Sequence, residues 1–212
     1  MKCHVVDLGL IDFDSAHEIQ KEFVAKVLED SESRLLFCEH PNVFTIGRIG
    51  SEEFFLDRPE HIRQKKIPIL RIDRGGEVTF HGSGQVVAYP IFNLSPSSKD
   101  LKKFLWKLEE VVIDLLRDFG IVANRKNGFT GVWVGSKKIA SLGIGVKKWV
   151  TYHGLGLNVN TDLTFFSMIK PCGLDVEMTS MAKELGSLVD CEKVKKQLIE
   201  CFKKEFSLEI LS

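Results

Sequence analysis

One cysteine and one lysine combine reactive side chains with a local sequence that could support chemistry. Cys172 stands between a proline and a glycine, so its thiol is expected on a turn and not along an apolar face. A thiolate nucleophile needs an activating cation or base, because a free cysteine is mostly protonated near neutral pH. The candidate partners in this chain are Lys138, His81 and His153. The alternative for Cys172 is a buried, unreactive thiol, the commoner role of a free cysteine.

The three candidate partners differ in what their surroundings allow. Lys138 opens an apolar run, Ile139-Ala140, and a lysine amine held in a partly apolar pocket can lose its proton and act as a base. A solvated strand position is the alternative, since lysines are normally exposed. His81 and His153, taken singly, are better explained as structural imidazoles in tight turns. No two histidines have the sequence spacing of a metal site, so we expect no metal.

Glycines and polar side chains interrupt predicted strands in two segments, residues 71–94 and 131–173. Alternating apolar residues there predict strands with one buried face. The glycines allow the backbone to turn or to approach another molecule closely. Ordinary bulges and hairpins would explain either segment alone. Because local rules are expected to break at functional sites, the two segments together indicate one site.

Composition places the chain among ordinary globular proteins. Its 212 residues are 44% hydrophobic and 27% charged, which is enough for one domain spanning residues 1–212. The formal net charge is zero, so no global field attracts nucleic acid or an anionic membrane. No apolar run is long enough to cross a bilayer. Five cysteines without a C-x-x-C pair argue against a disulfide framework and a zinc ribbon. We therefore expect a reduced, cytoplasmic protein.

The order of predicted elements indicates an α+β fold with a mixed or antiparallel sheet flanked by helices, because strands follow one another without a βαβ repeat. Strands are predicted at residues 3–10, 35–38, 43–48, 78–80, 86–88, 121–126, 131–134, 138–146 and 149–159. A capping box at Ser15–Glu18 predicts the start of a helix. Apolar residues recur with a 3.6-residue period over residues 101–119, which predicts a second helix with Gly120 as its C-cap. A third helix is predicted around residues 194–202. Residues 49–66 are expected to form a surface loop.

Several motifs resemble those of the octanoyltransferases of the lipoate pathway, the lipoyl(octanoyl) transferases. The resemblance covers roughly residues 35–180, and it is specific because separate motifs match in order and spacing. The motifs are Glu39-His40-Pro41, Thr45-x-Gly47-Arg48, Arg74-Gly75-Gly76-Glu77-Val78-Thr79-Phe80-His81-Gly82-Ser83-Gly84-Gln85, Tyr89-Pro90-Ile91, Lys138-Ile139-Ala140-Ser141-Leu142-Gly143, His153-Gly154-Leu155-Gly156-Leu157-Asn158-Val159-Asn160 and Pro171-Cys172-Gly173. The chain departs from the family at Ser83, usually proline, and at Gly156, often alanine.

The resemblance implies the fold of the biotinyl/lipoyl protein ligase catalytic domain and a reaction without a cofactor. An octanoyl group would pass from acyl carrier protein to a lysine ε-amine on a lipoyl domain. The implied acceptors are the E2 subunits of 2-oxoacid dehydrogenases and the glycine cleavage H protein. Cys172 would hold the acyl chain as a thioester, and Lys138 would activate the thiol and shuttle protons, with ping-pong kinetics. His153 would have a supporting, orienting role. The implied substrate-binding residues are Arg74, Gly75, Gly76, Glu77, Val78, Thr79, Phe80, His81, Ser141, Leu142, Gly143, Gly154, Leu155 and Gly156.

Two other functions are compatible with such a fold. A lipoate–protein ligase would activate a free acid with ATP, and it would need no cysteine nucleophile; the Pro-Cys-Gly turn at Cys172 argues against it. A non-catalytic module could bind lipoyl domains or acyl carrier protein, but it would have no use for both Cys172 and Lys138. Thiol reactivity would separate the enzyme from the binding module.

Overall fold

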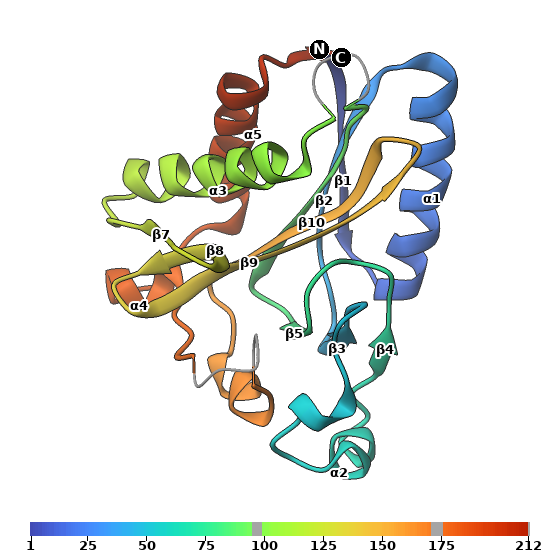
Figure 1. Cartoon of the computed structure of the whole chain (residues 1–212). Coiled ribbons are helices and arrows are strands. Elements are labelled where there is room, and N and C mark those ends of the chain that lie inside the picture. The colour runs from blue at the N-terminus through green and yellow to red at the C-terminus, as the bar shows by residue number, and fades with distance from the viewer. Residues whose placement is uncertain (95–98, 171–175, 212) are drawn as a thin grey trace.

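An eight-stranded mixed sheet forms the centre of the molecule, seen in a computed structural model that describes residues 1–94, 99–170 and 176–211 (Figure 1). The strand order is β11-β1-β2-β6-β10-β9-β8-β7. Strand β1 is parallel to β2 and β11, whereas the other neighbours are antiparallel, which confirms the predicted α+β class. The strands are β1 (Lys2–Leu10), β2 (Ser33–Glu39), β6 (Gln85–Ile91), β7 (Asn124–Lys126), β8 (Phe129–Val134), β9 (Lys137–Lys147), β10 (Val150–Asn158) and β11 (Glu209–Leu211).

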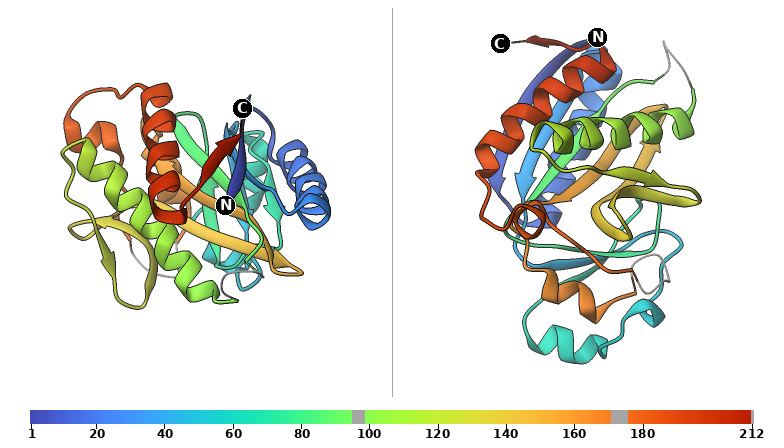
Figure 2. Two further views of the ribbon diagram at one scale, coloured as in Figure 1. Left: turned by 90° about the horizontal axis from the view of Figure 1, so that it is seen from above. Right: turned by 90° about the vertical axis from the view of Figure 1, so that its left-hand side faces the viewer.

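Helices cover both faces of this sheet (Figure 2). Helix α1 (Phe13–Asp30) lies on one face, and α3 (Leu101–Asp118) and α5 (Cys191–Phe206) lie on the other. The apolar stripe of α3, predicted from its 3.6-residue period, packs Leu108 and Leu115 into the largest core cluster. Helix α1 packs Val24 and Val27 into a separate cluster on its own side. Helices therefore pack against both faces of the large sheet, with α1 on one face and α3 and α5 on the other.

A second, three-stranded sheet lies at the lower end in Figure 1, with order β4-β3-β5. Its strands are β3 (Val43–Ile46), β4 (Ile69–Arg71) and β5 (Val78–His81). The short helices around it are η1 (Glu52–Phe54), α2 (Pro59–Gln64) and η2 (Leu163–Met168). The expectation of an irregular loop at residues 49–66 was therefore wrong in part. Proline at the first position of α2 fixes a helical φ. The fully buried Ile62 packs that helix into the hydrophobic cluster of the small sheet, which is separate from the core of the large sheet.

Two other predictions need correction, and three elements were not predicted. Helix α1 begins before the Ser15–Glu18 box, because the Asp12 carboxylate accepts the backbone N–H of Ser15 at 2.9 Å and caps the helix there. Strand β7 begins at Asn124, because Ile121 still donates its N–H to Leu116 at the end of α3. Strands β4 and β11 and helix α4 (Met181–Leu185) were not predicted as separate elements.

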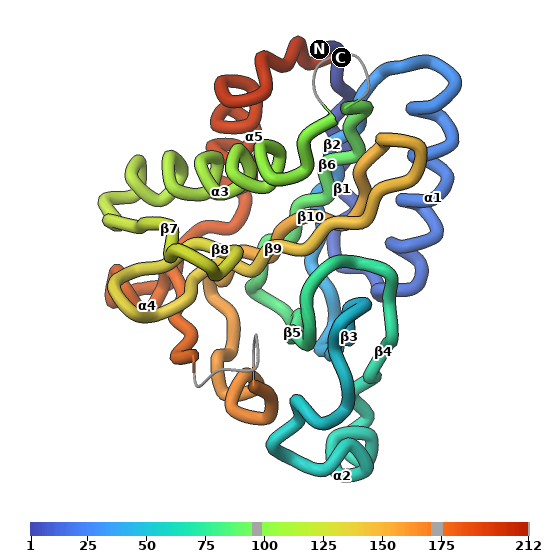
Figure 3. The backbone as a smooth tube through the Cα atoms, viewed as in Figure 1, coloured from blue at the N-terminus to red at the C-terminus, as the bar shows by residue number. Residues whose placement is uncertain are grey.

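The two ends of the described chain lie side by side (Figure 3). Strand β11 pairs in parallel with β1, and the amino group of Met1 donates to the carbonyl of Ser207 at 2.8 Å. This pairing extends the large sheet at its edge. No helix in the described part of the chain has the length and apolar character needed to cross a membrane.

Candidate active site

A cavity of about 400 Å³ lies where strands β5, β9 and β10 meet the segment that follows β4. Both motif-rich segments of the sequence contribute to its wall. Every residue that the resemblance implied for substrate binding lines it, except Phe80, together with Lys138 and His153. Phe80 instead packs against Phe165 in the core of the small sheet. Further lining residues that the sequence did not indicate include Phe13, Ile49, Leu105 and Phe129.

Lys138 is buried at the start of β9, with only 2% of its surface exposed. Its backbone is held on both sides, because its N–H donates to Glu177 and its carbonyl accepts from Thr179, each at 2.9 Å. Its Nζ lies 5.6 Å from the centre of the Trp133 ring, within cation–π range. The structure therefore excludes a solvated position for this lysine, and it directs a long amine side chain into the cavity wall.

Arg74 braces the segment that brings glycines to the cavity. One guanidinium nitrogen donates to the Thr45 carbonyl and hydroxyl and to the Glu77 carbonyl at 2.9–3.0 Å, and the other donates to the Gly75 carbonyl. The segment also lies directly against β9, where a Cβ on Gly143 would stand 2.8 Å from the Gly75 carbonyl oxygen. Only glycine fits at position 143. The brace and this close approach together set the shape of one cavity wall.

A chain of hydrogen bonds joins His81 to the neighbourhood of Lys138. His81 Nδ1 lies 2.7 Å from Gln85 Oε1, and the Gln85 amide donates to Asn158 Oδ1 at 2.9 Å. Asn158 donates in turn to the carbonyl of Thr179. Since Oε1 of Gln85 can only accept, Nδ1 of His81 carries the proton and Nε2 offers a lone pair. Burial lowers the pKa of His81 to about 3, so this imidazole is neutral at pH 7.

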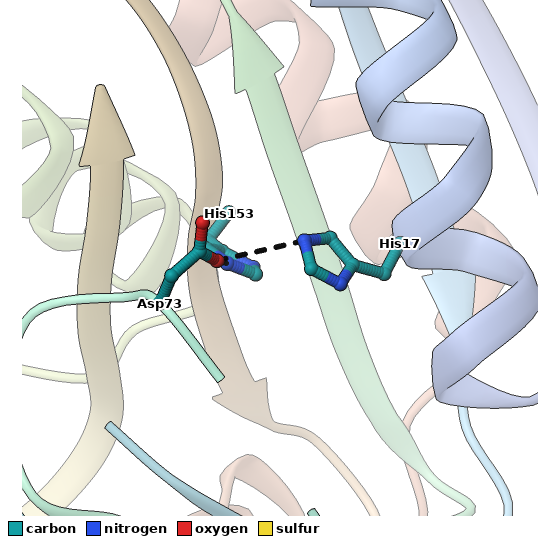
Figure 4. A group of neighbouring side chains, drawn as sticks. All are labelled: His17, Asp73 and His153. Carbon is teal, nitrogen blue, oxygen red and sulfur yellow. Dashed lines mark hydrogen bonds and ion pairs between the residues drawn. The ribbon is translucent and has the colours of Figure 1, made fainter. Parts of the chain in front are cut away.

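Asp73 contacts three side chains from two other elements. Figure 4 shows two of these side chains, those of His17 and His153. The Tyr152 hydroxyl donates to its Oδ2 at 2.6 Å, and Nε2 of His153 lies 2.9 Å from its Oδ1. Nε2 of His17, on α1, lies 3.5 Å from the same Oδ1. Burial opposes ionisation of Asp73, but the bonds from Tyr152 and His153 outweigh it and lower the pKa to about 2. Burial also lowers the pKa of His153 to about 4, despite the opposing Asp73 hydrogen bond. A neutral imidazole thus faces a carboxylate at pH 7.

The cysteines of the described chain are not activated. Cys3, Cys38 and Cys201 are buried, and burial raises the pKa of each thiol above its ordinary value, as it does for the half-buried Cys191. These four thiols are therefore packing residues and not nucleophiles. Cys172, the cysteine singled out from the sequence, lies outside the described residues.

Several polar residues at the site were not predicted from the sequence. Asp73 and His17 were not considered, although Asp73 directly precedes Arg74. His40 and Tyr89 belonged to motifs but were given no role, and the structure joins them at 2.7 Å. Adjacency to a motif was the one available signal for Asp73, whereas nothing in the sequence links His17 to β10.

Comparison with known proteins assigns the chain to a family. Residues 12–203 match the lipoyl protein ligase A/B catalytic domain. An octanoyltransferase of Caldanaerobacter subterraneus is 44% identical and aligns over 97% of this chain and 90% of its own length. One from Caldicellulosiruptor saccharolyticus is 46% identical over 97% of this chain and 89% of its own. The chain belongs to the octanoyltransferase family.

Octanoyltransferases are acyltransferases, and this member shares its fold with ligases. A bi-partite lipoate protein ligase from Thermoplasma acidophilum superposes with a TM-score of 0.80 at 18% identity, over all of this chain and 86% of that one. At that identity the likeness establishes the fold alone. It confirms the expected ligase-like catalytic domain, while the octanoyltransferase relatives favour acyl transfer over ATP-dependent ligation.

Proposed function

We propose that the chain transfers an octanoyl group from acyl carrier protein to a lysine ε-amine on a lipoyl domain, with Cys172 as nucleophile and Lys138 as its base. The proposed acceptors are the lipoyl domains of the E2 subunits of 2-oxoacid dehydrogenases and the glycine cleavage H protein. The proposal places the reaction in the cytoplasm, where thiols stay reduced, and it uses no cofactor. The observation that carries it is the burial of Lys138 in the wall of the motif-lined cavity.

The surroundings of Lys138 support a role in proton transfer. A cavity of about 400 Å³ falls in the range of small-ligand sites, roughly 300–1,000 Å³. The backbone on either side of Lys138 is bonded to Glu177 and Thr179, which follow Cys172 by five and seven residues in the sequence. These two bonds hold Glu177 and Thr179, which lie close in sequence to the proposed nucleophile, beside Lys138.

The proposed reaction has two balanced steps. In the first, the Cys172 thiol gives its proton to the Lys138 amine and its sulfur attacks the octanoyl thioester. The carrier thiol leaves and takes that proton from the Lys138 ammonium. In the second, the lipoyl-domain amine attacks the acyl-enzyme thioester, a proton passes back to the cysteine sulfur, and the amide product forms. His81 and His153, both neutral at pH 7, are proposed to position groups around the cavity.

The deciding experiment compares two ways of supplying the acyl group. Octanoyl–acyl carrier protein without ATP is expected to support octanoylation of a lipoyl domain, and Cys172→Ser is expected to abolish it. Cys191→Ser changes a half-buried thiol outside the cavity lining and serves as the matched control. Transfer that requires octanoate and ATP would support the ligase instead. Octanoylation under neither condition would support a non-catalytic binding module.

A further inference from the structure

Three potential metal ligands from three separate elements converge beside the cavity. They are Nε2 of His17 on α1, Oδ1 of Asp73 in the segment between β4 and β5, and Nε2 of His153 on β10. All three atoms lie within 4.8 Å of one another. Figure 4 shows the two imidazoles directed at the carboxylate. This is the one such group found in the described part of the chain, and residue spacing could not reveal it because His17 and His153 are far apart in sequence.

A strained backbone brings two neighbouring side chains to this carboxylate. Successive residues of a strand normally point to opposite faces. His153 lies within β10 but has φ = +55°, a conformation that non-glycine residues rarely adopt. As a result, Tyr152 and His153 both reach Asp73, through its two different oxygens. Strain of this kind, held by the surrounding sheet, is typical of functional sites.

His17 supplies the second observation. Its Nε2 is buried and has no hydrogen-bond partner within the described residues, and its contact with Asp73 at 3.5 Å is long. An imidazole nitrogen that is removed from water without a good partner is costly to bury. A cation between His17, Asp73 and His153 would satisfy that nitrogen and use the Asp73 charge.

We propose that His17, Asp73 and His153 form a binding site for a divalent transition metal of the zinc class. Two imidazoles and one carboxylate are ligands that Zn²⁺ accepts, and three protein ligands leave a fourth position open. At zinc–ligand distances of about 2.0–2.1 Å the ligand atoms of a tetrahedral site are about 3.3 Å apart. The Asp73 oxygen lies 2.9 Å and 3.5 Å from the two nitrogens, on either side of that value. The Asp73 side chain is 52% exposed, so an ion can enter from solvent.

The surroundings also set the strength of the site. Tyr152 holds the second oxygen of Asp73, which is the outer-shell support that metal carboxylates usually have. Binding would move the proton of His153 from Nε2 to Nδ1, which is buried with no hydrogen-bond partner in the described chain. A missing outer-shell partner typically weakens binding about 10- to 100-fold, so we expect this site to bind zinc more weakly than a site with a complete outer shell. The bound ion would tie the segment carrying Arg74 to α1 and β10.

Zinc titration of the chelator-treated protein, in competition with a chromophoric chelator, tests the site. We expect saturable binding of one equivalent, a zinc-dependent rise in Tm, and a cobalt(II) spectrum without sulfur-to-metal absorption. Asp73→Asn keeps the shape of the side chain, and His17→Gln keeps a polar group. Each is expected to weaken this binding at least about tenfold. His61→Ala, which breaks a surface His–Asp pair at 3.2 Å, is the matched control and should bind as the parent does.

Three results would overturn the site, and circular dichroism of each variant ensures that a folded protein is measured. The first is the absence of saturable binding of a single equivalent. The second is binding that survives both Asp73→Asn and His17→Gln, and the third is thiolate absorption with cobalt(II), because in both cases the ion would be held elsewhere.

Discussion

Gly131 offers the sharpest test of how the fold positions Lys138. An alanine Cβ at this position would lie 2.4 Å from Lys138 Cε, 3.0 Å from its Nζ and 2.8 Å from the Ala140 carbonyl oxygen. Ordinary contact begins at 3.4 Å, so the lysine side chain must move by about 1 Å, and the neighbouring backbone of β9 must shift as well. Misplacement by about 1 Å can lower a rate about 100-fold, which is about 2.7 kcal/mol of transition-state stabilisation. We therefore expect Gly131→Ala to reduce the rate of octanoyl transfer by roughly that factor.

The same substitution also strains the backbone, so it needs a matched control. Gly131 has φ = +137°, and an alanine there costs about 1–3 kcal/mol of stability. Gly135, in the turn after the same strand, has φ = +58° and no atom within 4 Å of an added Cβ. Gly135→Ala should therefore lose stability but keep its transfer rate. The assay is single-turnover octanoyl transfer with unfolding measured in parallel. Equal rate losses in both variants, or a parental rate in Gly131→Ala, would show that the position of the Lys138 side chain does not set the transfer rate.

Three further predictions concern single side chains. Lys138→Met, which keeps the apolar stem, should slow acyl transfer about 10²- to 10⁴-fold, and an unchanged single-turnover rate would remove this lysine from the mechanism. Cys38→Ala should lower the free energy of unfolding by about 1 kcal/mol without changing the transfer rate, because it shortens a fully buried side chain. Loss of activity in a folded variant would indicate that Cys38, and not Cys172, is the reactive thiol. The His81 pKa is about 3 when folded and about 6.5 when unfolded, so between these values the unfolded chain binds a proton that the folded chain does not. His81 therefore leaves the free energy of unfolding unchanged above about pH 6.5 and lowers it as the pH falls toward 3. In urea unfolding, the free energy of unfolding should fall less between pH 7 and pH 5 for His81→Gln than for the parent. An equal fall in both proteins would contradict this.

The predictable parts of this molecule were those with local, periodic signals. The apolar repeat of residues 101–119 predicted α3, and the strands predicted at residues 131–134 and 138–146 correspond to β8 and β9. The short strands β4 and β11 were missed because three residues carry little periodicity and their pairing partners lie far along the chain. The cap at Asp12 was missed because a second capping pattern, at Ser15, competed with it.

The site was predictable where motifs named residues and not where the fold assembles them. Lys138 and the glycine-rich segments came from sequence, and the structure gathers them around one cavity. Asp73 has no periodic pattern, and its contact with His153 depends on a positive φ that histidine rarely adopts. The role of Gly131 is equally invisible in sequence, since it arises from contact with the side chain of Lys138 across a hairpin.

Intact-protein mass spectrometry after mixing with octanoyl–acyl carrier protein, in the absence of ATP, would show directly whether acyl transfer passes through Cys172. We expect one octanoyl adduct that maps to Cys172 and disappears when a lipoyl domain is added, while the octanoyl group appears as an amide on the acceptor lysine. An adduct on another residue, or transfer to the lipoyl domain without any adduct under single-turnover conditions, would contradict it.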